Sequence, residues 1–261
     1  MNWKSSSHRP EQQLEMYSKY IGGDTFIDYE KDESLAELIT GKSIAVVGPA
    51  KSIEGKGMGS FIDSFDLVIR PGQLTHLPDN ITDDYGKRTD IIFHSFNSWE
   101  RKIASKNIEF LKSLSYVVGC MVCVSDCNNY EDFRNKLISE GIKFHKPSDR
   151  YILRNFRDVG TTISCGISSI IILLEYDIKS LYITGFDFYN LGEYGKVYRD
   201  DYFDTVSPDS NGYIPNTSDK TVSPHSGRFD LHDQRTQMKF LKGLSERDGR
   251  IKLDDYLQEN L

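Results

Sequence analysis

His232 is the residue whose type and position best suit proton transfer. The chain has six histidines, and imidazole is the side chain that most readily exchanges a proton near pH 7. Asp230 is a good helix N-cap and Asp233 follows three residues later, so the spacing predicts a helix from Asp230 with His232 in its first turn. The positive end of a helix disfavours a protonated imidazole, which keeps the ring neutral and able to act as a base. On these residues alone, a purely structural histidine is the alternative.

A glycine-rich turn, residues 47–59, follows a short apolar run. It is not a phosphate-binding loop, because Lys56 is followed by glycine where serine or threonine is needed, and its glycine spacing is not that of a dinucleotide-binding motif. Backbone N–H groups after Gly48 can still meet an anion or a nucleotide. The alternative is a loop that needs glycine only for its backbone dihedral angles.

Three cysteines, Cys120, Cys123 and Cys127, have a spacing that resembles a metal site. The first two lie in an apolar strand pattern, where small thiols pack well, and no fourth ligand with matching spacing is nearby. The acidic residues at 200–204 lie in a polar stretch, where solvated loop charges are expected. The sequence therefore predicts no metal site and no cofactor.

The elements that would position these residues alternate between apolar strands and amphipathic helices. Strands are expected at 43–48, 66–70, 89–94, 116–124 and 181–184, and helices at 98–114, 130–140, 164–176 and 230–244. This alternation predicts a single Rossmann-like α/β domain, with a mostly parallel sheet and helices on both faces. The loops after Gly48, Arg70, His94 and Gly185 then converge at the carboxyl ends of the strands, where such folds bind ligands. The long polar stretch 189–224 is expected to be a lid or binding loop, or else disordered.

Composition excludes several classes of function. The 261 residues carry 32 basic and 39 acidic side chains, a net charge of −7, and the pI is near 5.4. This argues against a nucleic-acid coat or a basic membrane-surface protein. No apolar run approaches the roughly 18 residues of a transmembrane helix, and the first residues lack a signal-peptide core. With only four cysteines, the expectation is a soluble chain with reduced thiols in the cytoplasm.

The order of the motifs resembles that of the sialyltransferases of glycosyltransferase family 29 and, more distantly, the bacterial sialyltransferases of family 42. The long family motif is similar to residues 44–70, continuing to 86–90. The short motif is similar to Ser164-Cys-Gly166 and the strand that follows at 181–189. The final motif is similar to residues 232–237. The resemblance covers about residues 41–245.

This resemblance implies a GT-A-like variant of the Rossmann fold, with a catalytic domain at 41–261 after a helical, polar extension at 1–40. It implies inverting, metal-independent transfer of a sialic acid or Kdo-type sugar from a CMP-sugar donor to a glycan, glycolipid or polysaccharide acceptor. His232 would remove the proton from the acceptor hydroxyl. No nucleic acid and no transmembrane segment are expected.

The resemblance also implies a set of donor-binding residues, in which hydrogen-bond donors stabilise the leaving phosphate and the loop 190–224 closes over the donor. The set is Gly48, Pro49, Ala50, Ser52, Arg70, Ser95, Ser164, Cys165, Gly166, Gly185, Asp187, Phe188, Tyr189, Tyr194 and His225.

Three positions depart from the family pattern. Pro49 and Gly72 stand where asparagine is usual, and Gln237 stands where glutamate is expected. Cys165 has no cysteine partner in the long motif, so the usual disulfide is absent, which suits a cytosolic enzyme. A catalytically degenerate nucleotide-sugar-binding module is therefore the alternative. A nicotinamide-dependent enzyme is disfavoured, because no dinucleotide-binding motif follows the first strand.

Overall fold

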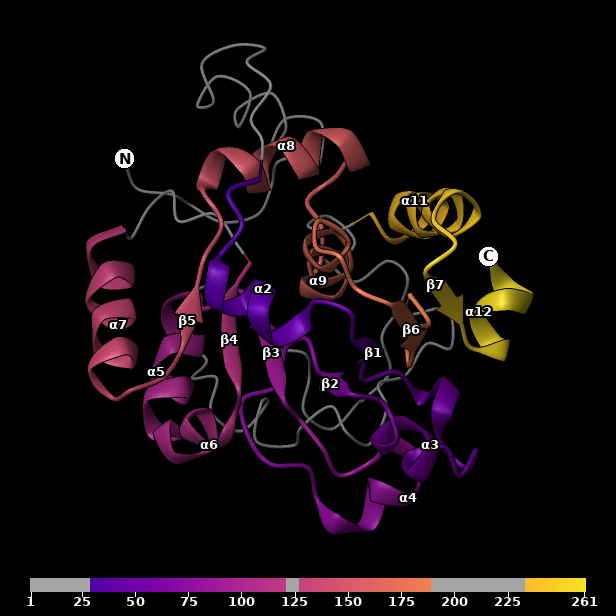
Figure 1. The fold of residues 1–261 in the computed structure, drawn as a ribbon, viewed down its shortest axis with the longest axis horizontal. Helices are drawn as coiled ribbons and strands as arrows, with labels where there is room; N and C mark the ends of the chain where they lie inside the picture. The colour runs from indigo at the N-terminus through magenta and orange to yellow at the C-terminus, as the bar shows by residue number, and fades with distance from the viewer. Residues whose placement is uncertain (1–28, 121–126, 189–232) are drawn as a thin grey trace.

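Seven parallel strands form one sheet in the order β5-β4-β3-β2-β1-β6-β7 (Figure 1). The computed structural model describes residues 29–120, 127–188 and 233–261. The strands are β1 (Ser43–Val47), β2 (Leu67–Ile69), β3 (Ile91–His94), β4 (Tyr116–Gly119), β5 (Phe144–His145), β6 (Ser180–Thr184) and β7 (Ile251–Leu253). The predicted α/β fold with a parallel sheet is confirmed.

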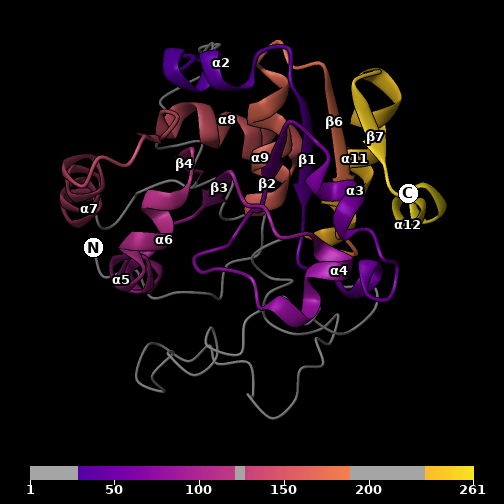
Figure 2. The ribbon, with the colours of Figure 1, turned by 60° about the horizontal axis from the view of Figure 1, so that its bottom comes forward.

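Helices cover both faces of this sheet. They are α2 (Glu33–Ile39), α3 (Gly59–Asp63), α4 (Thr82–Tyr85), α5 (Ser98–Lys106), α6 (Ile108–Ser113), α7 (Cys127–Ser139), α8 (Asp149–Val159), α9 (Cys165–Leu174), α11 (Gln234–Arg247) and α12 (Asp255–Asn260), with 3-10 turns at Lys51–Ile53 and Asp79–Ile81. Helices α2, α8, α9 and α11 share one hydrophobic core with the sheet, whereas α3 to α7 pack on the opposite face (Figure 2).

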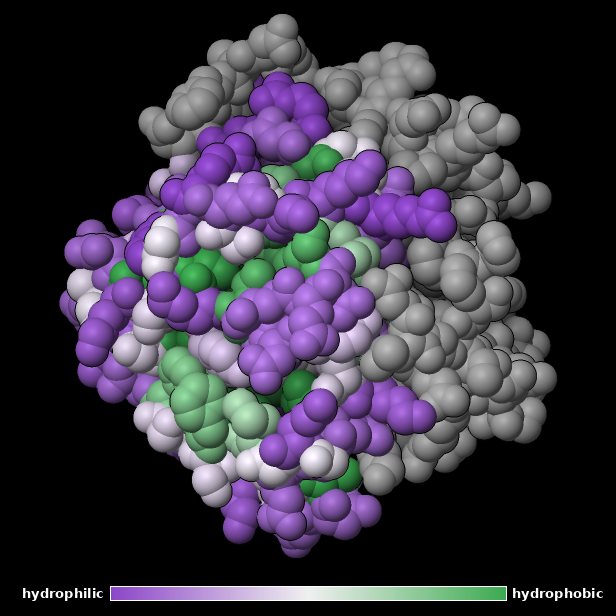
Figure 3. Space-filling model, turned by 90° about the vertical axis from the view of Figure 1, so that its right-hand side faces the viewer, coloured by the Kyte–Doolittle hydropathy of each residue, from purple (hydrophilic) through white to green (hydrophobic). Residues whose placement is uncertain are grey.

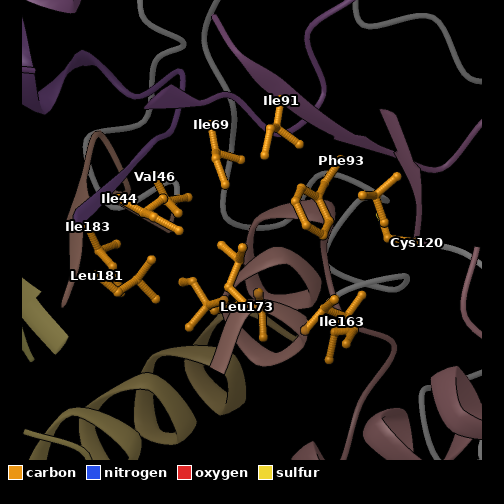
Figure 4. Packing of buried hydrophobic residues seen from close by; sticks show 14 of the residues in the cluster. Ile44, Val46, Ile69, Ile91, Phe93, Cys120, Ile163, Leu173, Leu181 and Ile183 are labelled. Atoms are coloured by element: carbon orange, nitrogen blue, oxygen red, sulfur yellow. The ribbon is translucent and has the colours of Figure 1, made fainter. Parts of the chain in front are cut away.

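The side chains of β1 alternate between the two faces of the sheet, and both faces are covered, so its sequence is apolar throughout. Ile44 and Val46 belong to the core beneath α9, while Ala45 and Val47 face α3, and all four are at most 2% exposed. A parallel strand covered on both faces has no polar side. Figure 4 shows Ile44 and Val46 together with residues of β2, β3 and β6, packed around Leu173 of α9.

The surface is more polar than this interior. Phe61 and Ile138 are the large hydrophobic side chains that are strongly exposed in the described part of the chain. On the face that carries α11 and α12, hydrophilic residues predominate and hydrophobic ones show through in separate patches (Figure 3). Within the described ranges, no helix is long and apolar enough to cross a membrane.

Several element boundaries differ from those expected. The single helix predicted over 98–114 is two helices, because the chain leaves helical geometry at Asn107 (φ −114°, ψ 36°). The strand predicted over 116–124 ends at Gly119, and its last residues lie outside the described ranges. Strands β5 and β7 and helices α8 and α12 were not predicted. Leu35 and Ile39 of α2 are fully buried in the core beside α9, although the boundary at residue 40 remains a prediction.

The strand order places a topological switch point between β1 and β6. From β1 the chain adds β2 to β5 outward in one direction, and it then returns to place β6 on the other side of β1. Connections on the two sides of such a point diverge, which opens a crevice at the carboxyl ends of the two strands. The loops after Val47 and Thr184 are therefore where a ligand site is expected.

Candidate functional site at the carboxyl edge of the sheet

The loops after β1 and β6 are joined through their backbones. The Gly48 N–H donates to the Thr184 carbonyl oxygen at 2.8 Å, and the Ala50 N–H donates to the Gly185 carbonyl oxygen at 2.9 Å. A Cβ atom on Gly48 would lie 2.3 Å from the Gly185 oxygen, and Gly185 itself has φ +73°. Backbone approach alone requires glycine at both positions, and it brings two predicted site residues together.

The amino end of α9 adjoins this junction. Ser164 caps the helix, accepting a hydrogen bond from the Ile167 N–H at 3.3 Å. A Cβ atom on Gly166 would lie 2.3 Å from the ring of Phe186, so this glycine lets the β6 loop pack against the helix. The unpaired N–H groups and the dipole at a helix amino end attract anions. Ser164, half-buried Cys165 and Gly166 therefore form, with Gly48 and Gly185, an edge suited to a phosphate.

The start of α11 is anchored to the same segment, but not where the sequence predicted. Helix α11 begins at Gln234, and its N-cap is Asp233, whose carboxylate accepts from the Thr236 N–H and hydroxyl. The expected N-cap at Asp230 is wrong, and His232 precedes the cap instead of occupying the first turn. The Asp233 carboxylate thus binds an N–H group in the first turn of α11. The Thr161 hydroxyl fixes the Asp233 backbone as well, because it accepts from the Asp233 N–H at 3.1 Å.

His232 itself lies outside the described residues, so its role stays a prediction. The same holds for Tyr189, Tyr194, His225, the loop 190–224 and the acidic residues at 200–204. Asp233 nevertheless fixes where the chain enters α11, beside Thr161 and close to the amino end of α9.

Arg70 has its guanidinium group engaged with backbone carbonyls. Its Nε donates to the Arg88 oxygen at 2.9 Å, and its Nη2 donates to the oxygens of Tyr85 and Gly86. The side chain is 2% exposed, and burial lowers its pKa to about 10. Arg70 therefore holds the end of α4 against the sheet, and its predicted contact with a donor remains untested.

The backbone N–H groups of the glycine-rich turn bind a carboxylate of the protein itself. The N–H groups of Gly55 and Gly57 both donate to the carboxylate of Asp84 at 2.8 Å. A Cβ atom on Gly59 would lie 2.1 Å from the Thr82 oxygen, so this glycine allows α3 to pack on α4. The distal glycines of the turn thus have structural roles, while Gly48 alone faces the switch point.

Among the other residues predicted near the first loop, Ala50 and Ser52 are buried and Pro49 is half-buried. The Ala50 oxygen accepts from the hydroxyl of Tyr85 at 2.9 Å. The Ser52 hydroxyl is buried, and no residue in the described ranges bonds to it. These contacts place Ala50 as a support of the β1 loop.

After β6, Asp254 stabilises the loop that carries Asp187 and Phe188. Its carboxylate accepts from the Thr184 hydroxyl at 2.6 Å and from the Gly185 N–H at 3.3 Å. Asp187 is 6% exposed, and Phe188 lies in the core with φ +51°. A left-handed backbone at a non-glycine residue stores strain, and such strain concentrates at functional loops.

A second polar cluster, not predicted as a unit, lies at the carboxyl end of β3. Ser95 donates a hydrogen bond to the carboxylate of Glu100, and His94 Nδ1 lies 3.4 Å from that carboxylate. Phe96 between them has φ +49°. The signal available in the sequence was a capping box, with Asn97 followed by glutamate three residues later. Ser95 is thus tied to Glu100, and its contact with a donor stays a prediction.

Glu100 should make stability depend on pH. Burial alone would raise the pKa of its carboxyl group, but His94, Ser95 and the Asn97 N–H lower it below the ordinary value of 4.5. A lowered folded-state pKa stabilises the fold above the unfolded pKa, and this contribution disappears as the pH falls through the folded value. Glu100→Gln should therefore lower the free energy of unfolding at pH 7 by about 1–3 kcal/mol.

Urea denaturation at a series of pH values measures this effect. The difference between the wild type and Glu100→Gln should shrink below the ordinary pKa of 4.5. Glu109→Gln is the matched control, because the side chain of Glu109 is 89% exposed in its pair with Lys112. Equal stability of wild type and Glu100→Gln at pH 7 would contradict the assignment.

The described cysteines are free thiols. Cys120 is buried in the main core, where burial raises the pKa of its thiol, and Cys165 is half-buried. Cys123 and the side chain of Cys127 lie outside the described residues. Within the described part, no three histidine, cysteine, aspartate or glutamate side chains are grouped as a metal site requires.

A cavity of about 380 Å³ lies elsewhere, at the β5 edge of the sheet. Its walls include Asp32, Tyr130, Arg134, His145 and Lys146. None of the residues predicted to bind the donor lines it. Because β5 is four strands away from β1, this cavity is separate from the switch point, where folds of this kind bind ligands.

The sheet, its switch point and the adjoining helix amino end define a Rossmann-like α/β protein with a candidate ligand site at the carboxyl edge of the sheet. Residues 26–151 match the model of glycosyltransferase family 29 (sialyltransferase). Over residues 26–151, this match confirms the family resemblance predicted from the motifs. No curated protein sequence matches it.

Solved structures of similar fold include the sialyltransferase CstII from Campylobacter jejuni in complex with a substrate analogue, cytidine-5'-monophosphate. It has 13% identity and a TM-score of 0.50, and the match covers 82% of this chain and 80% of that one. A mammalian sialyltransferase has 14% identity and a TM-score of 0.46, with 97% and 80% covered. A structure of a mammalian sialyltransferase in complex with Gal-beta-1-3GalNAc-ortho-nitrophenol has 14% identity and a TM-score of 0.44. That match covers 96% of this chain and 80% of the other. At 13% identity, the similarity to CstII shows a shared fold.

Proposed function

We propose that the protein transfers a sialic acid or Kdo-type sugar from its CMP-linked donor to a hydroxyl group of a glycan, glycolipid or polysaccharide, with inversion and without a metal. The observation that carries this proposal is the meeting of Gly48, Gly185 and the amino end of α9 at the switch point, in a chain that matches a sialyltransferase family. The cytidine monophosphate named in the CstII structure supports a cytidine donor.

The proposed chemistry follows from the charge of the leaving group. The acceptor oxygen bonds to the anomeric carbon as the bond from that carbon to the phosphate oxygen breaks, and CMP leaves with the electron pair. A single phosphate ester carries less charge than a diphosphate, so N–H donors at the amino end of α9 are suited to stabilise it. His232 accepts the proton that the acceptor hydroxyl loses.

A thermal-shift screen tests the nucleotide. CMP should raise the melting temperature more than CDP, UDP, GDP or NAD at equal concentration, because a ligand stabilises only the state that it binds. A larger shift with UDP or GDP would replace the donor assignment, and a larger shift with NAD would favour a nicotinamide-dependent enzyme.

Consumption of the donor separates an enzyme from a binding module. With CMP-sialic acid or CMP-Kdo and a mixture of glycan acceptors, we expect release of CMP at a rate that EDTA leaves unchanged. Loss of the rate in EDTA, restored by a divalent cation, would overturn metal independence. CMP binding without donor consumption would favour the degenerate module.

A further inference from the structure

Two free thiols meet where the end of β4 contacts the amino end of α9. Cys120 is the residue that follows β4, and Cys165 is the first residue of α9. Their side chains are hydrogen-bonding partners. Cys120 belongs to the main hydrophobic core, and Cys165 packs against that core. Figure 4 shows Cys120 close to Phe93 of β3, on the side of the sheet that α9 covers.

The backbone on both sides of this thiol pair is held in place. The Cys120 N–H donates to the His94 carbonyl oxygen at 3.0 Å, which continues the pairing of β4 with β3. On α9, Gly166 follows Cys165, and a Cβ atom on this glycine would lie 2.3 Å from the ring of Phe186. The two sulfur atoms are therefore carried by packed elements, so their proximity is a property of the fold.

The two thiols differ in exposure. Cys120 is fully buried, whereas Cys165 is half-buried. Burial raises the pKa of the Cys120 thiol, so this thiol stays protonated and does not react first with an oxidant. An oxidant in solution reaches Cys165 first, and Cys120 then lies in position to react with the oxidised sulfur.

We propose that Cys120 and Cys165 form a reversible disulfide bond on oxidation by hydrogen peroxide, and that this bond draws the amino end of α9 towards β4 and weakens donor binding. Cys165 attacks the peroxide, the O–O bond breaks, and a sulfenic acid and one water result. The Cys120 sulfur then bonds to the Cys165 sulfur as the S–O bond breaks, and a second water leaves. Two thiols lose two electrons and two protons, and one peroxide becomes two waters.

The bond changes the donor edge because disulfide sulfurs lie about 2 Å apart, closer than hydrogen-bonded thiols. Cys120 is fixed to the sheet, so Cys165 moves. Gly166 packs against Phe186 of the β6 loop without spare room, so movement of the amino end of α9 alters that contact. Ser164 and Gly166 belong to the edge proposed to hold the phosphate. The effect on the donor therefore rests on the proposed function, whereas the disulfide does not.

Oxidation of a protein that keeps only this pair tests the bond. The chain has four cysteines, so Cys123→Ser and Cys127→Ser leave Cys120 and Cys165. After treatment with hydrogen peroxide, the intact monomer should be lighter by two hydrogen atoms, and dithiothreitol should restore its mass. Tandem mass spectrometry should locate the same bond in the oxidised wild type. The melting temperature should rise by about 5 °C or more, because the link closes a long loop in the unfolded chain.

Calorimetry with CMP measures the consequence for the donor edge. The oxidised two-cysteine protein should bind CMP about threefold or more weakly than its reduced form. Cys120→Ala in the same background is the matched control, because it removes the partner and keeps Cys165. Reduced, it should bind CMP within about twofold of the two-cysteine protein, and peroxide should not raise its melting temperature. Should this control not fold, Cys165→Ala gives the same test of the bond.

The outcomes separate this inference from the proposed function. If no Cys120–Cys165 bond forms, or if peroxide raises the melting temperature of the control equally, the thiol pair is overturned. If the bond forms and both forms bind CMP equally, the effect on the donor edge is overturned. If the reduced wild type binds no CMP, the proposed function fails, while mass spectrometry still decides whether the disulfide forms.

Discussion

His232→Ala is expected to lower the rate constant of sugar transfer by about 10²–10⁴-fold while leaving the affinity for CMP within about twofold of wild type. A general base acts on the acceptor hydroxyl in the transition state, so its removal affects kcat more than donor binding. Asp233, the next residue, is held beside Thr161 near the amino end of α9.

Single-turnover kinetics with a CMP-sugar donor, together with CMP calorimetry, measure the two effects of His232→Ala separately. Added imidazole should restore part of the rate, because it replaces the missing base. His76→Ala, at an exposed histidine outside the predicted donor-binding set, is the control and should retain activity. If the His232 variant turns over normally and His225→Ala does not, the base is His225.

The second large effect is expected from Gly185→Ala, which should destabilise the fold by about 3 kcal/mol or more and abolish CMP binding. A Cβ atom at this position would lie 2.4 Å from the Gly48 oxygen, and the φ of +73° is strained for alanine. Backbone atoms on both sides cannot give way as a flexible side chain can. The two loops must therefore separate, which disrupts the switch point itself.

Denaturant unfolding and CMP calorimetry check this result. Gly249→Ala is the matched control: no atom lies within 4 Å of the added Cβ, so its stability should stay within about 0.5 kcal/mol of wild type. A Gly185→Ala protein that is stable and binds CMP would show that the β1 and β6 loops do not need this backbone contact.

Much of the architecture was predictable from the sequence because burial leaves a local signal. The continuous apolar runs of β1 and β6 and the apolar helix α9 were recognised from composition and length. Helix α8 also carried a signal in the sequence, although the helix was not predicted. Ser148 is a typical N-cap residue, and buried side chains recur on one face of the helix after it: Tyr151, Ile152, Asn155, Phe156 and Val159. The two-residue strand β5 is too short for any period to be seen.

The candidate site was predictable only in part. The motifs located Gly48, Ser164, Gly166 and Gly185, which the fold brings to one edge. Arg70 was also singled out, but its guanidinium is taken up by backbone oxygens from residues 85–88, a partner choice that no local pattern reveals. The Glu100 cluster was missed, because its members gain meaning only from their contact with His94.

By itself, the sequence determined which segments are buried and the family that the motif order resembles. The tertiary structure decided which groups satisfy one another: Asp84 for the amides of the glycine-rich turn, Asp233 for the first turn of α11, and Gln237 for Ser164. The reason is physical. An apolar period is visible within a few residues of sequence, whereas a hydrogen-bond donor or a close backbone contact can find its partner tens of residues away. Only the packed sheet and helices determine those partners.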